Sequence, residues 1–166
     1  MISSTLEISI LNAIAQAYNG AGGSASSNVV TFPNAGYLAL FTVMPSRNAD
    51  TGVLGGGTEV SGGGYQRVDL DGNPFGSHYF TSAPSWDNTN KCFVIQNSSA
   101  IQFPMATASW STVVGFGIYD AATNGNLTMA GTLDASQAVA QDNAVAFAAG
   151  ALKISLADVQ PAASNT

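Results

Sequence analysis

Residues 110–133, WSTVVGFGIYDAATNGNLTMAGTL, constrain the fold of this chain more than any other stretch. Two apolar runs rich in strand-forming residues, 113–119 and 126–133, flank the turn segment DAATNG. The pair Asn124 and Gly125 suits a tight hairpin turn, because both residue types tolerate a positive φ at little cost. The stretch therefore predicts an antiparallel β-hairpin.

The two faces of the first strand of this hairpin differ in character. One face carries large apolar side chains that suit a core, whereas the other carries glycines that let a second backbone approach closely. The first face comprises Val114, Phe116 and Ile118, and the second comprises Val113, Gly115, Gly117 and Tyr119. No acid, base, thiol or metal ligand projects from either strand interior, so the hairpin is expected to be scaffold.

Further short apolar runs predict more strands, separated by turn residues. This spacing, without alternating helices, indicates a mainly β fold, either an antiparallel β-sandwich or a jelly-roll, with one N-terminal α-helix. Residues 45–64, which hold two GGG triplets, are expected to form a flexible connection. The additional strands are predicted at residues 36–42, 65–70, 78–81, 91–97, 100–104, 143–150 and 151–158.

The predicted helix covers residues 4–19. Ser4 and Glu7 have the spacing of a capping box, and Gly20 provides a stop. An apolar stripe repeats every four residues, which is typical of an amphipathic helix. Its members are Leu6, Ile10, Ile14 and Tyr18. Two interpretations stay open: a helix packed over its own domain, or an arm that docks on a neighbouring subunit.

These patterns divide the chain into four parts. We expect an N-terminal helical arm at residues 1–20, a linker at 21–35, a β-sandwich domain at 36–158 and a flexible tail at 159–166. The apolar segment ISILNAIAQA resembles the core of a signal peptide, but no Lys or Arg precedes it and Glu7 interrupts it. We therefore expect no signal peptide and an intact cytoplasmic product.

The chain has very few charges. Charged residues make up 8% of the sequence, against about a quarter in ordinary soluble proteins. Such a surface is easier to understand when an assembly covers it, although an extracellular β protein kept in solution by neutral polar groups is the alternative. The net charge is −6, with four scattered cations, which argues against binding to nucleic acid or to anionic membranes.

The sequence offers little for catalysis or metal binding. His78 is the one histidine, Cys92 is the one cysteine and sits in an apolar run, and no G-x-S-x-G motif is present. We therefore expect no enzyme, no cofactor and no metal centre, and a buried Cys92. A hydrolase would need His78 to cluster with an acid such as Asp69 or Asp71.

One acidic turn needs a separate test. Asp69, Asp71 and Asn73 have the spacing that opens many calcium loops. Such loops place glycine at the sixth position and glutamate at the twelfth, where this chain has Pro74 and Phe80. A β-turn stabilised by its own side chains is the favoured interpretation, and cation binding stays open.

Several aromatic residues allow two interpretations. They would line a carbohydrate-binding face, or they fill the core and subunit contacts, as large aromatic side chains usually do. The core is favoured for Trp110 and Phe116, and both interpretations stay open for Trp86. The set considered comprises Tyr65, Tyr79, Trp86, Trp110 and Tyr119.

The order of motifs resembles a family of small tailed-bacteriophage virion proteins, often labelled tail fibre proteins and close in character to capsid cement or decoration proteins. The resemblance is carried by YLALFT, GTEVSGGGYQR (57–67), the block FPMATASW (103–110) leading into FGIYDA, and AVAFAAGALKISL (144–156). It implies a non-enzymatic structural role in the virion. The main expectation is a capsid cement protein that binds and stabilises the assembled head shell, and the alternative is a tail fibre component that contacts the host surface.

The same reasoning predicts partners and contact residues. The expected partners are the major capsid protein or other virion proteins, together with further copies of the chain in a dimer or trimer. Aromatic and arginine side chains are favoured at interaction hot spots. The predicted partner-binding residues are Leu6, Ile10, Ile14, Tyr18, Tyr65, Arg67 and Trp86. For Arg67, an ion pair with Asp69 on the same strand face is the alternative.

Overall fold

The computed structural model describes residues 36–47, 54–70, 79–80 and 84–155, and in this part the chain is mainly β with antiparallel pairing. This confirms the mainly β, antiparallel part of the predicted fold class. The predicted helix, the linker at 21–35 and the tail at 159–166 lie outside the described residues. The described strands are β1 (Tyr37–Val43), β2 (Ser46–Arg47), β3 (Leu54–Gly55), β4 (Thr58–Glu59), β5 (Val68–Asp69), β6 (Ser85–Asp87), β7 (Cys92–Gln96), β8 (Ile101–Gln102), β9 (Ser111–Tyr119), β10 (Leu127–Val139), β11 (Ala146–Phe147) and β12 (Lys153–Ser155).

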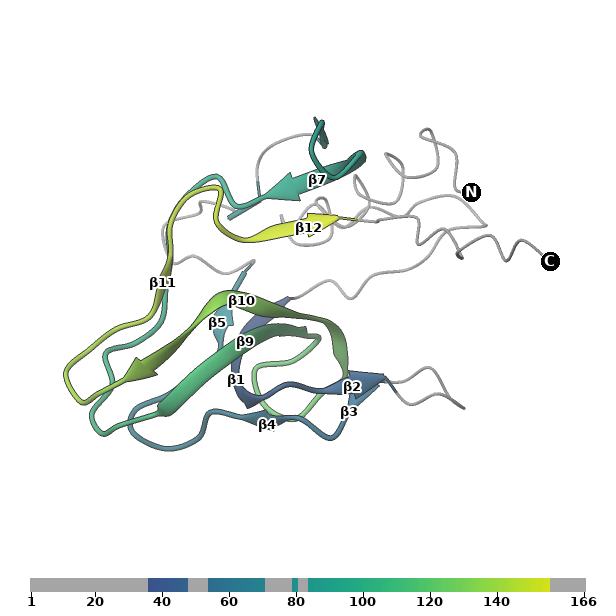
Figure 1. Cartoon of the computed structure of the whole chain (residues 1–166). Coiled ribbons are helices and arrows are strands. Elements are labelled where there is room, and N and C mark those ends of the chain that lie inside the picture. Colours follow the sequence, from purple (N-terminus) through teal and green to yellow (C-terminus); the bar gives the residue numbers. More distant parts are fainter. Residues whose placement is uncertain (1–35, 48–53, 71–78, 81–83, 156–166) are drawn as a thin grey trace.

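The predicted hairpin, β9 and β10, forms one side of a five-stranded sheet, with β10 at its edge. The strand order is β10-β9-β1-β4, and β5 pairs with another part of β1 (Figure 1). Asn124 and Gly125 have φ values of 56° and 74°, so the predicted positive-φ turn is confirmed. β1 is buried along its middle, as the sequence predicts for residues 36–42, because it lies between β9 on one side and β4 and β5 on the other.

The glycine face of β9 is closely approached by both backbone and side chains. A Cβ at Gly117 would lie 2.7 Å from both Leu127 Cδ1 and Phe41 Cε2, and one at Gly115 would collide with the Met44 side chain. The carbonyl oxygen of Gly131 would lie 2.7 Å from the same Cβ at Gly115, which is the close backbone approach that the sequence predicts. The glycines also make room for large side chains from adjacent segments, which the sequence did not predict.

A second sheet, in the order β12-β7-β6, lies across from the five-stranded sheet, and the segment through β11 runs between them (Figure 1). Both sheets contribute to one cluster of buried apolar side chains. Ile95 of β7 and Ile154 of β12 belong to the same cluster as Leu38, Leu40 and Ile118. Burial of this shared core is the main force that holds the two sheets together.

Several predicted strands are shorter in the structure. The run at 65–70 contributes only β5, the run at 100–104 only β8 and the run at 143–150 only β11. Of the run at 151–158, the described part, 151–155, contains β12. Tyr79 and Phe80, from the predicted strand at 78–81, are not in a strand, although Phe80 is fully buried. Apolar content marked these runs as buried, but backbone pairing with a neighbour decides how far a strand extends.

The glycine-rich segment at 45–64 is not a plain flexible connection. It contains β2, β3 and β4 in its described part. The Gly63 carbonyl accepts hydrogen bonds from Trp110 Nε1 at 2.8 Å and from the Thr107 amide at 2.8 Å. With a φ of 55°, Gly63 adopts a conformation that other residues rarely reach, so the second triplet is a defined turn that supports Trp110.

Two predictions about buried side chains are confirmed. Trp110 is 3% exposed and Cys92 is also buried. Within the described residues, the structure has no helix with the length and apolar character needed to cross a membrane.

We predict that Gly117→Ala lowers the free energy of unfolding by about 1–3 kcal/mol, because the added methyl group overpacks the space held by Phe41 and Leu127. Urea unfolding measures the change. Gly55→Ala is the matched control, since a Cβ there meets nothing within 4 Å, and its effect is expected to stay within about 0.5–1 kcal/mol. Equal stabilities for the two variants would show that the glycine face of β9 has room to spare.

Candidate functional site

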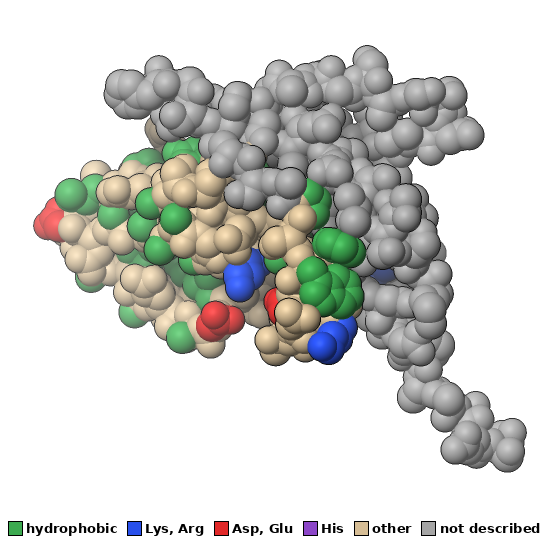
Figure 2. Space-filling view, turned by 90° about the horizontal axis from the view of Figure 1, so that it is seen from above, with side chains coloured by type: hydrophobic (Ala, Val, Ile, Leu, Met, Phe, Trp, Pro, Cys, Tyr) green, Lys and Arg blue, Asp and Glu red, His purple; other side chains and the backbone are tan. Residues whose placement is uncertain are grey.

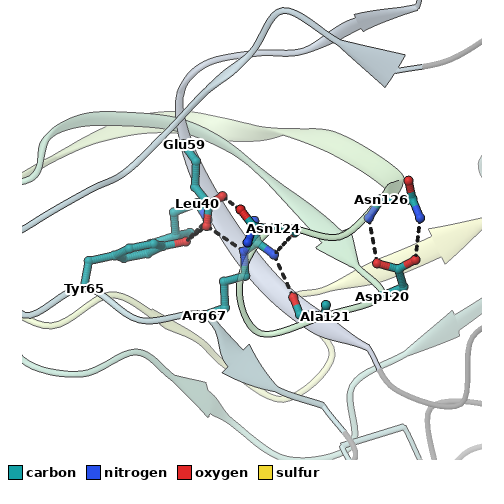
Figure 3. A network of polar contacts seen from close by, with 8 residues as sticks. All are labelled: Leu40, Glu59, Tyr65, Arg67, Asp120, Ala121, Asn124 and Asn126. Atoms are coloured by element: carbon teal, nitrogen blue, oxygen red, sulfur yellow. Dashed lines mark hydrogen bonds and ion pairs between the residues drawn. The ribbon is translucent and has the colours of Figure 1, made fainter.

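The most densely connected polar group in the described structure is the Arg67 guanidinium (Figure 3). Its Nε and Nη2 donate to the two carboxylate oxygens of Glu59, at 2.8 and 2.7 Å. Its Nη1 donates to the carbonyls of Ala121, at 2.7 Å, and Asn124, at 2.8 Å. Arg67 thereby ties β4 to the turn between β9 and β10. We call this set of contacts the arginine clamp.

An aromatic ring completes the clamp. The Cζ atom of Arg67 lies 3.5 Å from the centroid of the Tyr119 ring, which is a cation–π contact. Tyr119 in turn stacks on Phe41, with ring centroids 6.3 Å apart. The guanidinium therefore has charge-assisted hydrogen bonds in its plane and an aromatic face beside it, an arrangement that lysine cannot reproduce.

Tyr65 connects the clamp to the core. Its hydroxyl donates to Glu59 Oε1 at 2.9 Å and accepts from the Leu40 amide at 3.0 Å. Its ring packs edge-on against Trp110, with centroids 5.4 Å apart, and stacks on Phe103. Because the hydroxyl is buried, and because Glu59 is negatively charged beside it, the pKa of Tyr65 is raised well above its usual value.

In the clamp, the charges of Arg67 and Glu59 compensate each other within the protein. Burial alone would lower the pKa of Arg67, but its hydrogen bonds to Glu59 and the charge of that carboxylate outweigh this effect and raise it. The Arg67 side chain is only 8% exposed and that of Glu59 is 23% exposed. Both charges are thus satisfied inside the protein, which suits a structural role better than proton transfer.

The hairpin turn is also held by its own side chains. The Asp120 carboxylate accepts hydrogen bonds from the backbone amide of Asn126 at 2.6 Å and from its Nδ2 at 2.8 Å (Figure 3). These bonds lower the pKa of Asp120, and the bond from the Asn126 side chain has the larger effect. The turn is therefore fixed on one side by Asp120 and on the other by Arg67.

Three of the predicted partner-binding residues lie in the described part of the chain. Tyr65 and Arg67 meet in the clamp, and Trp86 lies in strand β6 of the β12-β7-β6 sheet. Leu6, Ile10, Ile14 and Tyr18 lie outside the described residues. Their predicted role in partner binding stays a prediction. Arg67 precedes β5 and forms its ion pair with Glu59 of β4, so the residue that the sequence interpretation missed is Glu59.

Trp86 lies in strand β6 and is 46% exposed. The indole packs edge-on against Phe93, with centroids 5.1 Å apart, and its Nε1 donates to Asn88 Oδ1 at 3.1 Å. An exposed, fixed indole on the outer strand of a sheet is suited to contact a partner.

No group of three or more His, Cys, Asp or Glu that could hold a metal ion occurs among the described residues. Asp71, Asn73 and His78 lie outside this part of the chain. The calcium-loop and hydrolase hypotheses, which need those residues, therefore stay untested.

A groove of about 510 Å³ opens beside the arginine clamp. One wall comes from the segment around residues 59–67 and the other from the hairpin turn at 122–124. The face of the molecule seen in Figure 2 is mostly uncharged, with few red and blue side chains among the tan and green ones. The groove is lined by Glu59, Val60, Ser61, Gly62, Tyr65, Gln66, Arg67, Ala122, Thr123 and Asn124.

An antiparallel β protein whose buried charges fasten loops to strands has the character of a structural protein. The comparison with known families agrees, since the profile of the family described as Podophage GP4 fiber I protein gp80 matches residues 2–155. The chain belongs to this family of phage virion fibre proteins. A comparison with curated proteins finds no match.

Family membership confirms the predicted resemblance to phage virion proteins. It supports a structural protein of the virion and fits the tail fibre alternative better than the capsid cement expectation. The match includes GTEVSGGGYQR and FGIYDA, the motifs from which the arginine clamp is built.

We predict that Arg67→Lys lowers the free energy of unfolding by about 1–3 kcal/mol, because an ammonium group cannot bridge Glu59 and two carbonyls at once. Thermal or urea unfolding measures the loss. Arg47→Lys, at an exposed position of β2, is the matched control, and its effect should stay within about 0.5 kcal/mol. If the two substitutions have the same effect, the clamp does not stabilise the fold.

We predict that stability falls as pH rises above about 10, the pKa of tyrosine in an unfolded chain. Above that pH the unfolded state loses the Tyr65 proton while the native state, with its raised pKa, keeps it, so unfolding becomes easier. The expected slope for this one proton approaches about 1.4 kcal/mol per pH unit.

Urea unfolding between neutral and strongly alkaline pH tests this expectation. Tyr65→Phe should be less stable at neutral pH, because the Leu40 amide loses its acceptor, and should show a shallower alkaline decline. Tyr119, whose pKa is raised by burial, adds to the same decline, so Tyr65→Phe with Tyr119→Phe should flatten it further. An unchanged slope in both variants would contradict the assignment.

Proposed function

We propose that this chain is a non-enzymatic structural subunit of a podophage tail fibre. The observation that carries the proposal is the family match over residues 2–155, which spans all the described strands. The geometry supports it, because the largely buried charges of Arg67 and Glu59 are used for internal contacts. No arrangement of nucleophile, base and orienting group is needed to explain them.

The arrangement of the sheets supports a finer description of the fold. The five-stranded sheet and the β12-β7-β6 sheet share one core cluster, which is the arrangement expected of a β-sandwich. We therefore assign the described part of the chain to this architecture as part of the proposal.

The proposed partners are other virion proteins and further copies of this chain. Large apolar side chains remain exposed in the described part, at Val43 (53%), Trp86 (46%) and Met105 (61%). Together with the 8% content of charged residues, they suit a subunit that is covered by neighbours in a dimer or trimer. The N-terminal stripe of Leu6, Ile10, Ile14 and Tyr18 is proposed as a further contact.

Localisation in purified particles tests the proposal. Particles decorated with a Fab raised against this chain are imaged by cryo-electron microscopy, with an unrelated Fab as control. We expect Fab density on fibres attached to the tail, and averaging of that density counts the copies in each fibre. A regular array of Fab on the head shell would refute the fibre assignment and restore the capsid cement interpretation.

A further inference from the structure

The turn between β9 and β10 contains a chemically labile pair, Asn124 followed by Gly125. An asparagine side chain deamidates when the backbone nitrogen of the next residue attacks its carboxamide carbon, and glycine has no side chain to shield that nitrogen. Both residues are exposed. Among the described residues, neither the Asn124 carboxamide nor the Gly125 amide has a hydrogen-bond partner. The pair therefore has the solvent access and the free groups that the reaction requires.

The backbone conformation of Asn124 keeps the two reacting atoms apart. Ring closure needs the Gly125 nitrogen on the same side of the Cα–C bond of Asn124 as its Cβ atom. Asn124 has a φ of 56°, in the left-handed region, where ψ lies at about +30 to +60°. At such a ψ, the chirality of an L residue places the next nitrogen nearly opposite to Cβ. The folded turn is therefore expected to suppress the reaction.

The arginine clamp holds the peptide group that contains the attacking nitrogen. The Asn124 carbonyl and the Gly125 nitrogen belong to one planar unit, so they rotate together. Arg67 Nη1 donates to this carbonyl at 2.8 Å and to the carbonyl of Ala121 at 2.7 Å (Figure 3). Rotation of the nitrogen toward the Asn124 side chain swings the carbonyl away from Arg67, so its hydrogen bond must break before the reaction can occur.

The residues on the other side of the turn restrict the same movement. The Asp120 carboxylate accepts hydrogen bonds from the Asn126 amide at 2.6 Å and from its Nδ2 at 2.8 Å. A Cβ added at Gly125 would lie 2.9 Å from Ala121 Cβ and would collide with Asp120 Oδ1, which shows that Gly125 is packed against the start of the turn. The labile pair is thus held from both sides.

We propose that Asn124 is a deamidation site that the arginine clamp protects, and that opening of the clamp allows the reaction. In the open turn, the Gly125 nitrogen bonds to Cγ of Asn124. The carboxamide nitrogen leaves as ammonia and receives, through water, the proton that Gly125 loses. A water molecule then opens the succinimide ring to isoaspartate or aspartate. The net reaction consumes one water and releases one ammonia, and all its other atoms come from the turn itself.

The isoaspartate product changes the turn permanently. Its main chain runs through the former side chain, so the turn gains one backbone atom and a free carboxylate. With this added length, Arg67 no longer meets the two carbonyls in their present positions. A subunit whose clamp has opened for long enough is therefore marked by a covalent change that prevents the clamp from re-forming. This protection does not depend on where the subunit lies in the virion.

Deamidation of the folded and unfolded chain is the first test. The full-length chain is incubated at mildly alkaline pH, in buffer and in guanidinium chloride, and deamidation is followed by peptide mapping with mass spectrometry. Asn19, which Gly20 follows, is the internal reference for the unfolded chain. In denaturant we expect Asn124 and Asn19 to react at similar rates. In the folded chain, Asn124 should react at least about tenfold more slowly than in denaturant, because a charge-assisted hydrogen bond must break first.

Matched variants connect this protection to the clamp. Arg67→Lys should speed deamidation of Asn124 in the folded chain by about tenfold. Ile95→Val, in the buried part of β7, is the matched control, since it lowers stability without a change in the clamp. Its rate should stay within about twofold of the original, because global unfolding remains rare. Glu59→Gln, which weakens the hold on Arg67, should give a smaller acceleration and serves if Arg67→Lys does not fold.

The product supplies the last test. Anion exchange separates the modified chain through its added negative charge, and electron-transfer fragmentation identifies the isoaspartate form. We expect this form to unfold at a lower urea concentration than the unmodified chain. Equal rates of Asn124 deamidation in the folded and unfolded chain, equal rates in the clamp variants and Ile95→Val, or an isoaspartate form as stable as the unmodified chain would overturn the inference.

Discussion

The contact on which this structure depends is the paired hydrogen bonding between the Arg67 guanidinium and the Glu59 carboxylate. A buried charge is costly unless every polar atom finds a partner, and here the carbonyls of the hairpin turn and the Tyr119 ring complete the set around Arg67. The pair joins β4 to the turn between β9 and β10, segments that are far apart in the sequence. In a chain with so few charges, this ion pair is used for the internal architecture.

The hairpin of β9 and β10 provides the space in which large side chains of neighbouring segments pack. Gly115 and Gly117 on β9 admit the side chains of Phe41, Met44 and Leu127, which occupy the space that larger side chains at these two positions would fill. The Gly63 turn has a comparable role on the opposite side of the site, where its carbonyl receives Trp110. Small residues thus determine where the large ones lie, and the clamp and the groove beside it are built on that packing.

Features of the fold that depend on residues close together in the sequence could be predicted from it. The turn at Asn124 and Gly125, the buried run of β1 and the buried Trp110 follow from residue type and spacing. The Arg67–Glu59 pair could not be predicted, because it depends on the path of the chain between two short strands and not on a shared strand face. The glycine triplet at 62–64 was interpreted as flexible, since sequence alone does not reveal that a distant indole will bond to its backbone. Likewise the strand β6 that holds Trp86 could not be predicted, because it is defined by its pairing with β7.

The clamp also imposes an order on how the chain matures. Arg67 bonds to carbonyls that lie 54 and 57 positions later in the sequence, so its site is incomplete until the hairpin turn has been synthesised. Contacts of such long sequence separation form only after the intervening chain has closed into a loop, and they slow folding. Until that loop has closed, the charges of Glu59 and Arg67 lack the turn carbonyls as partners, so the complete clamp forms only together with the fold around it.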